Sequence, residues 1–282
     1  MIRRAIINAD DFGLCRGVNE GIIEAHDSGI LSSASLMVNM PGFDHAVELA
    51  RGRPKLGVGV HLNIIRGVPV APPGRVAGLL CASGSFTGSP YTVLKRLMSG
   101  ELCRAEIERE FRAQVEKVLA SGIVPDHLDS EKHVHALFPV FPAAVKIAAE
   151  YGIRGIRIVE EICLAGGPVP ALKALALSAA APVLRRRLRA HGIMAAARFR
   201  GLCVSGCMTR RRLEAVLERL EGVCEIMVHP GRMTPELLAL DRMTGCAYVR
   251  NHRRLELEAL LDEGPKRILK RRGIALTTYG EL

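Results

Sequence analysis

The 282-residue sequence contains no tryptophan and only four tyrosines, and aromatic side chains make up 4% of the chain. Proteins that bind single-stranded nucleic acid stack its bases on aromatic side chains, and no nucleic-acid-binding motif is present here. The eight cysteines include no C-x-x-C pair and no disulfide-like spacing. This spacing favours a reducing compartment and mostly buried thiols. We therefore expect a cytoplasmic protein without a nucleic-acid partner.

Long uninterrupted apolar runs are also missing. The longest apolar tract, residues 171–184, contains Lys173 and Pro182, and it is too short to cross a bilayer. The apolar run at the N-terminus is broken at Asp10, too early for a signal peptide. The stretch 163–190 predicts a helix that packs on the body of the protein, with at most a peripheral contact with a membrane.

The formal net charge is +10, and much of it lies in local clusters of arginine and lysine. Such clusters attract nucleic acid or anionic membranes in some proteins. They are more often the solvated faces of helices, and we prefer that interpretation here. The clusters lie at 185–189, 210–212, 250–254 and 266–272.

Apolar, strand-like runs alternate with helical stretches along the chain. The predicted strands are residues 5–7, 33–39, 56–63, 126–130, 153–159, 202–205, 224–229 and 274–278. About eight strand–helix units in a chain of this length predict an α/β protein with a single-domain (β/α) barrel of the TIM type. The alternative is a doubly wound open sheet, which usually carries a glycine-rich phosphate loop where this chain has Asp-Asp-Phe-Gly.

Glycine and proline mark two further features. Gly57 and Gly59 inside the third predicted strand indicate close approach of the backbone to a neighbouring group. Residues 66–90 are rich in proline and glycine and predict a long loop. Because long loops within compact domains are usually functional, we expect an insertion at the active site.

Polar side chains gather where the predicted strands end. They are Asp10, Asp11, Asn39, His61, Asn63, His127, Asp129, Glu131, His133, His135, Arg157, Glu160 and His229. In a parallel barrel these strand ends meet at one face, where barrel enzymes have their active sites. The pattern therefore predicts a single site built from several strands.

The segment 127–135 offers three imidazoles and two carboxylates, which are ligands for Zn²⁺, Mn²⁺ or Mg²⁺. Any one of these histidines is more often an ordinary hydrogen-bonded residue. Together with Asp11 and His61, however, the segment predicts a metal site. His229, which precedes Pro-Gly, is either a turn residue or a general acid.

Four motifs in order along the chain resemble the YdjC-like carbohydrate deacetylases. That family includes chitooligosaccharide deacetylases and a branch associated with hopanoid biosynthesis. The resemblance runs from about residue 3 to Leu282, so it implies one deacetylase domain over 1–282. The motifs are NADDFG at 8–13, GVHLN at 59–63, HLDSEKHVH at 127–135 and VHP at 228–230.

The resemblance implies a distorted (β/α) barrel that uses one divalent metal ion to remove an acetyl group from an N-acetylated sugar. It implies that Asp10 is the general base and His229 the general acid. By position, Asp11, His61 and Glu131 would hold the metal. The substrate would be of the N-acetylglucosamine type or a sugar linked to a lipid, and a homodimer is one option for the assembly.

The chain departs from the family pattern at the third metal ligand, because many relatives have histidine where this chain has Glu131. A carboxylate makes the site harder and more anionic, which favours Mg²⁺ or Mn²⁺ over Zn²⁺. His133 or His135 could instead replace Glu131. We expect substrate contacts from Asn63 and Asp129.

Arg157 is either a third substrate contact or part of an ordinary salt bridge. The fold and the ligands do not fix the substrate, so another metal-dependent barrel hydrolase, a glycosidase or a phosphoesterase, is the alternative function. A glycosidase needs two flanking carboxylates, which Asp10 with Glu131 or Asp129 could supply. A binding protein without activity would leave the residues at the strand ends unexplained.

Overall fold

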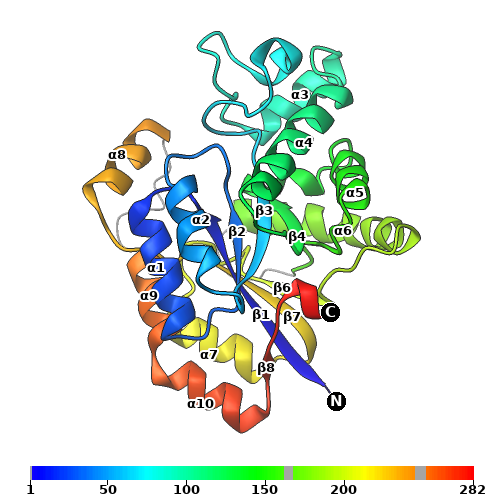
Figure 1. The fold of residues 1–282 in the computed structure, drawn as a ribbon. Helices are drawn as coiled ribbons and strands as arrows, with labels where there is room; N and C mark the ends of the chain where they lie inside the picture. The colour runs from blue at the N-terminus through cyan, green and yellow to red at the C-terminus, as the bar shows by residue number, and fades with distance from the viewer. Residues whose placement is uncertain (1, 162–167, 245–251) are drawn as a thin grey trace.

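The computed structural model describes residues 2–161, 168–244 and 252–282. In these ranges a parallel sheet forms the centre of the molecule, and helices lie around its outside (Figure 1). The strands are β1 (Arg3–Phe12), β2 (Ser33–Leu36), β3 (Gly57–Leu62), β4 (His127–Ser130), β5 (Gly155–Ile156), β6 (Arg198–Arg200), β7 (Gly222–Val228) and β8 (Ala275–Leu276). The α-helices are α1 (Arg16–Asp27), α2 (Phe43–Arg51), α3 (Pro90–Ser99), α4 (Arg104–Ala120), α5 (Phe141–Glu150), α6 (Pro168–Ala190), α7 (Arg210–Glu218), α8 (Pro235–Thr244), α9 (His252–Leu261) and α10 (Glu263–Arg272).

The strands follow one another around a curled sheet in the order β5-β4-β3-β2-β1-β7-β6. Gly155 in β5 forms a parallel bridge to Met194, shortly before β6, so the two edges of the sheet approach each other. The strand β8 distorts this arrangement, because it pairs with Arg4 and Ala5 at the start of β1, while β2 pairs with β1 from Asn8 onwards. The predicted α/β fold with a distorted barrel is confirmed.

The strand β1 lies at the centre of the sheet, and its residues from Ala5 to Phe12 are all buried. A parallel strand that is covered on both faces needs apolar residues on both, which explains the run Ala5-Ile6-Ile7. Against it packs α1, which buries Val18, Ile22 and Ala25 at helical spacing. The two carboxylates that follow the apolar run are therefore held at the end of a rigid strand.

The predicted strand at 202–205 is wrong. These residues form a turn, in which Ser205 N donates to Leu202 O at 3.3 Å, and the strand β6 lies slightly earlier. Phe199 is the only apolar residue in β6, between Arg198 and Arg200, and it is fully buried. A single buried residue between two arginines leaves no apolar run for the sequence to show.

The cysteines also differ from the prediction of mostly buried thiols. Cys15 and Cys224 are buried and free as expected, but Cys81 and Cys103 are exposed. Cys203 is disulfide-bonded, which the spacing of the cysteines did not indicate. The prediction is therefore wrong for these last three residues.

The helix α6 packs on the body of the protein, as predicted from the stretch 163–190, of which residues 163–167 lie outside the described ranges. Residues on one side of α6 are buried: Ala174, Leu177, Ala181, Leu184 and Leu188. None of the helices that the structure describes is both long enough and apolar enough to cross a membrane.

The glycines of β3 confirm the predicted close approach. A Cβ atom added at Gly59 would lie 2.3 Å from Cε1 of the His127 ring. That ring is held in place, because its Nδ1 lies 2.6 Å from Asp126 Oδ1 and its Nε2 lies 3.1 Å from Ser35 Oγ. It also stacks on Tyr279 with the ring centroids 4.5 Å apart.

We expect Gly59→Ala to lower the free energy of unfolding by about 1–3 kcal/mol, because the new methyl group must displace a fixed ring. Gly52→Ala is the control, since Gly52 has a φ of −78° and a Cβ there would meet only Leu49 O at 3.7 Å. Its effect should stay within about 0.5 kcal/mol. Urea denaturation measures both, and equal effects would contradict the close contact.

Candidate active site

The ends of β1, β3 and β4 bring three ligand-type side chains together. His61 Nε2 lies 3.9 Å from Asp11 Oδ1 and 3.8 Å from Glu131 Oε2. All three residues are buried, and one ligand atom from each lies within 4.8 Å of the others. Two ligand atoms that share one ion at about 2.1 Å lie roughly 3–4 Å apart. Asp11, His61 and Glu131 are thus close to the separation needed to hold one metal ion.

Asp129 is also near His61, but it contacts the other ring nitrogen. His61 Nδ1 lies 2.9 Å from Asp129 Oδ1. A metal-binding histidine usually donates its second N–H to a carboxylate, which fixes the tautomer and the direction of the ring. Asp129 Oδ2 is itself bound by Ser35 Oγ at 2.9 Å and Arg157 Nη1 at 2.6 Å. The geometry therefore favours Asp129 as the group that orients His61, with Nε2 left to face the ion.

Asp11 and Glu131 each direct one carboxylate oxygen at His61 and accept a hydrogen bond from an arginine with the other. Asp11 Oδ2 accepts from Arg253 Nη2, and Glu131 Oε1 accepts from Arg66 Nη2, the latter at 2.5 Å. Burial opposes ionisation of Asp11, but Arg253 and Arg66, with His229 and His61, outweigh it and hold the pKa of Asp11 below its usual range. Asp11 is therefore a full negative charge at neutral pH.

The backbone is strained beside both carboxylate ligands. Asp11 has a φ of +70°, and Lys132 and His133, which follow Glu131, have φ values of +53° and +59°. These are the non-glycine residues with positive φ in the described parts of the chain. Such conformations cost on the order of 1–3 kcal/mol each and are concentrated at functional sites. The turn at Asp11 also lets the adjacent Asp10 and Asp11 point to different partners.

Asp10 is held by Arg157 in a bidentate ion pair, with Nη1–Oδ2 and Nη2–Oδ1 distances of 2.8 and 2.7 Å. Arg157 also binds Asp129, and its Nε donates to Glu225 Oε1 at 2.8 Å. Burial disfavours a charged guanidinium, but these three carboxylates hold the pKa of Arg157 well above its usual value. Of the two interpretations of Arg157, the structure shows the salt bridge.

Asn63 shapes the loop that carries Arg66. Its Nδ2 donates to Asn39 Oδ1 and to Arg66 O, both at 2.9 Å. Its Oδ1 accepts from the backbone N–H groups of Ile65 and Arg66. Asn63, Asp129 and Arg157 have no exposed surface. In this structure the three residues take part in the hydrogen bonds and ion pairs around the site, and their contact with a substrate stays a prediction.

The structure favours Glu131 over the two alternative ligands. His135 is fully buried, with Nδ1 2.6 Å from Ser130 Oγ and Nε2 3.0 Å from Arg157 O, so both ring nitrogens are occupied. Its pKa is lowered to about 4, mainly by burial. His133 Nδ1 is buried and has no hydrogen-bond partner among the described residues. Two groups of described side chains could hold a metal, Asp11 with His61 and Glu131, and Asp10 with His61 and Asp129, and His133 belongs to neither.

His229 follows β7 directly. The register of β1 and β7 places Ala9 opposite Val228, so Asp10 in β1 and His229, directly after β7, lie at the same edge of the sheet. The side chain of His229 is 19% exposed. It is thus accessible from outside, whereas the side chain of Asp10 is 4% exposed.

Two residues of α9 were missed by the sequence analysis. Arg253, which we assigned to a solvated cluster, is only 6% exposed and contacts Asp11. Glu256 is 1% exposed and accepts from the backbone N–H of His229. Both share the buried face of α9 with Leu257 and Leu260. A charged residue on an apolar stripe needs a buried partner, and this was the signal available in the sequence.

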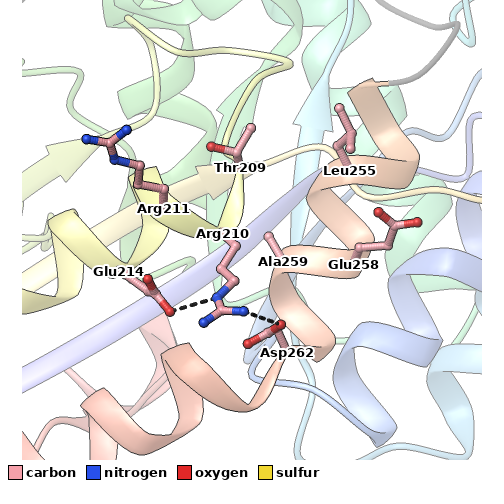
Figure 2. A pocket seen from close by; sticks show the side chains of 8 residues that line it. All are labelled: Thr209, Arg210, Arg211, Glu214, Leu255, Glu258, Ala259 and Asp262. Atoms are coloured by element: carbon pink, nitrogen blue, oxygen red, sulfur yellow. Dashed lines mark hydrogen bonds and ion pairs between the residues drawn. The ribbon is translucent and has the colours of Figure 1, made fainter.

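A surface cavity of about 530 Å³ lies between α7 and α9 and shares no residue with the site above (Figure 2). In it, Arg210 pairs with Glu214 at 2.9 Å and with Asp262 at 3.2 Å. Its central charges are therefore already neutralised, and we assign no ligand to it. The lining residues are Thr209, Arg210, Arg211, Glu214, Leu255, Glu258, Ala259 and Asp262.

A family model described as YdjC-like protein matches residues 4–271. The chain belongs to this family. The carbohydrate deacetylase of Geobacillus stearothermophilus is 32% identical over 100% of this YdjC-like chain and 98% of its own. The chitooligosaccharide deacetylase of Klebsiella pneumoniae strain 342 is also 32% identical, over 100% of both chains. Other carbohydrate deacetylases align over segments that span between 57% and 71% of their length.

One solved structure supports the fold along nearly the whole chain. It is a protein from Enterococcus faecalis V583 with the provisional name of cellobiose-phosphate cleavage protein. It is 25% identical, with a TM-score of 0.76 over 99% of this chain and 98% of its own. The resemblance inferred from the four motifs is confirmed by the family match.

Metal binding to the YdjC-like site should depend on pH through His61. Burial disfavours the imidazolium, but Asp129, with Asp10 and Asp11, outweighs it and raises the pKa of His61 to about 9. In the metal-free protein His61 is thus protonated at neutral pH, and an ion must displace the proton on Nε2. Between pH 6 and pH 8, below this pKa, we expect the apparent dissociation constant for the metal to fall about tenfold for each unit by which the pH rises.

Titration calorimetry in buffers of different ionisation enthalpy measures how many protons are released when the ion binds, and we expect about one proton per ion. In Asp129→Asn the carboxylate that raises the pKa is lost, so the pH dependence should flatten above neutral pH. A wild-type affinity that does not change between pH 6 and pH 8 would contradict this assignment of His61.

Proposed function

We propose that this YdjC-like protein is a divalent-metal-dependent hydrolase that removes the acetyl group from an N-acetylated sugar. One observation carries the proposal: His61 directs Nε2 at Asp11 and Glu131 while Asp129 binds Nδ1. The names of the relatives, carbohydrate deacetylase and chitooligosaccharide deacetylase, support the sugar and the acetyl group.

The donor set fits one divalent cation. Two carboxylate oxygens and one imidazole nitrogen form a hard, anionic site, which favours Mg²⁺ or Mn²⁺, with Zn²⁺ as the other candidate. When bound, the ion polarises the acetamide carbonyl and lowers the pKa of a water molecule. Asp11, His61 and Glu131 would hold it, and Arg253 and Arg66 would fix the two carboxylates.

The chain itself supplies the proton transfers. Asp10, held by Arg157, accepts the proton of the water whose oxygen attacks the acetyl carbon. Protonated His229 then donates to the sugar nitrogen as the C–N bond breaks, which gives acetate and a free amine. Without this protonation the amine leaves poorly, and general acid–base help is typically worth about 10²–10⁴ in rate.

The loop 66–90 covers the sugar in this proposal. Both of its ends contact the segment that carries Glu131: Arg66 binds Glu131, and Lys132 Nζ donates to Gly88 O at 3.3 Å. A loop anchored in this way can exclude water from the reacting groups.

The alternative barrel hydrolases have less support. A glycosidase needs two carboxylates that are free to act on the bond. Asp129 has no exposed surface and binds both His61 and Arg157, and Glu131 contacts His61 and Arg66, so neither is free to act as the second carboxylate beside Asp10. The released product, acetate, sugar or phosphate, separates the three reactions directly.

The first test is acetate release from N-acetylglucosamine-containing substrates, with protein stripped of metal and reloaded with Mg²⁺, Mn²⁺, Zn²⁺ or Co²⁺. We expect metal-dependent acetate, and a decrease of at least about a hundredfold in Asp11→Asn together with weaker metal binding. Asp27→Asn is the matched control, because Asp27 forms only an exposed ion pair with Arg53. An Asp11→Asn variant that keeps both activity and metal would refute the assignment.

We also propose that any membrane contact is peripheral and uses the outer face of α6. Leu172, Leu175 and Val183 are 69%, 66% and 54% exposed on this helix. Arg186 and Arg189 are exposed further along it, and residues 168–190 contain no acidic side chain. Exposed apolar residues followed by cations suit the surface of an anionic membrane, which would fit a sugar linked to a lipid.

Wild-type protein should bind phosphatidylglycerol vesicles more tightly than phosphatidylcholine vesicles, and added salt should weaken the binding. The double variant Arg186→Glu with Arg189→Glu should lose most of this binding. The control is Arg211→Glu with Arg219→Glu, which makes the same charge change at exposed positions near α7. Co-sedimentation measures all three proteins, and equal losses in the two variants would argue against a specific role of α6.

A cytoplasmic location, a homodimer, a link to hopanoid biosynthesis and a single domain over 1–282 stay predictions from the sequence.

A further inference from the structure

His229 has a buried ring nitrogen that faces a buried carboxylate. Within the described residues His229 Nδ1 has no hydrogen-bond partner, and Glu256 Oε2 lies 3.9 Å from it. Glu256 lies in α9, 27 residues after His229 in the chain. The pair is therefore brought together by the fold and not by proximity in the chain.

Two backbone amides fix the carboxylate of Glu256. Its Oε1 accepts from Met208 N at 2.9 Å, and its Oε2 accepts from His229 N. With 1% of the residue exposed, water does not compete for these oxygens. A carboxylate held in this way keeps a constant position relative to the His229 ring.

In the part of the chain that the structure describes, Asp11 on β1 and Arg253 on α9 are further charged groups near His229. Asp11 on β1 is close enough for its ionisation to be influenced by His229. Arg253 on α9 contacts Asp11 through its side chain and the loop of His229 through its backbone, where Arg253 O accepts from Gly231 N at 3.2 Å. The side chain of Arg253 thus pairs with Asp11, and Glu256 is the carboxylate that faces Nδ1 of His229.

We propose that Glu256 is a positioning residue for His229. Its carboxylate receives the Nδ1–H of the imidazolium, so that Nε2–H is directed at the nitrogen of the departing sugar. A small rotation of the ring brings Nδ1 from 3.9 Å to the ordinary distance of about 2.7–2.9 Å for a charge-assisted hydrogen bond. This inference rests on the proposed function, in which His229 is the general acid.

The proton balance is simple. The proton on Nε2 passes to the sugar nitrogen as the C–N bond breaks, and the electron pair of that bond stays on nitrogen. The proton on Nδ1 remains on His229, and Glu256 stays ionised throughout. Solvent then returns a proton to Nε2. The carboxylate therefore acts only through His229, by fixing its tautomer and stabilising its charged form.

The test compares Glu256→Gln with wild type as metal-loaded, full-length enzymes on the same N-acetylglucosamine-containing substrate. We expect kcat to fall about a hundredfold, with KM changed less than about threefold. The alkaline limb of the kcat profile should move to lower pH by about one unit, because the imidazolium loses a stabilising carboxylate. Glu256→Asp, which keeps the charge, should retain the position of the limb.

Glu258→Gln is the matched control. Glu258 lies two residues along the same helix, is exposed, and lines the surface cavity on the other side of α9 (Figure 2). Its kcat, KM and pH profile should equal those of wild type. A Glu256→Gln profile with an unmoved alkaline limb would overturn the proposal.

An aryl acetate such as 4-nitrophenyl acetate separates positioning from damage to the structure. Its leaving group departs without a proton, so Glu256→Gln should cleave it at a rate within about threefold of wild type. An equal loss on both substrates would show that Glu256 only supports the fold and would overturn the inference.

A measurement on the wild-type protein covers the case in which Glu256→Gln does not fold. The ¹⁵N shifts of the His229 ring, assigned with His229→Gln, report which nitrogen carries a proton as the pH rises. Nδ1 should keep its proton while Nε2 loses it, and the reverse order would overturn the proposal. Absence of acetate with every metal would refute the proposed function, whereas an active wild type with the reverse order would refute only the role of Glu256.

Discussion

A fully buried guanidinium at the centre of the barrel holds the rest of the site in place. Arg157 binds three carboxylates that come from three strands: Asp10 from β1, Asp129 from β4 and Glu225 from β7. Carboxylates in a dry interior are costly unless they are paired, and removing one member of such a group leaves the others uncompensated. The alignment of these strands and the charge of the site therefore depend on the same side chain.

The network extends from Arg157 in two directions. Towards the candidate metal site, Asp129 fixes the ring of His61, whose Nδ1 lies 2.9 Å from Asp129 Oδ1. Towards the opposite side, Glu225 accepts from Tyr279 Oη at 2.6 Å, and Tyr279 stacks on His127. The C-terminal segment thus supports the same network as β1, although the two are far apart in sequence. This continuity explains how a distorted barrel can keep a precise arrangement of ligands.

The sequence predicted those residues of the site that lie at the ends of strands. Asp11, His61 and Glu131 each lie at or next to the end of a predicted strand, and the meeting of parallel strand ends at one face grouped them with the other polar residues there. The family resemblance then singled out these three as metal ligands. Their partners could not be predicted in this way. Whether Arg157 faces a substrate or three carboxylates, and whether Arg253 faces solvent or Asp11, depends on tertiary contacts that span up to 242 residues. The strand β6 was missed for a related reason, because its one buried residue has no apolar neighbours in sequence.

In the proposed metal site, the two arginines beside Asp11 and Glu131 represent a compromise between stability and metal affinity. Once His61 has lost its proton, Asp11 and Glu131 would repel each other across it, and Arg253 and Arg66 neutralise them. The same positive charges reduce the attraction of the site for a cation. Each arginine, however, binds the oxygen that His61 does not face, so the inner oxygens stay directed at the ion position. The site therefore gives up some affinity in exchange for ligands that are already ionised and oriented when the ion arrives.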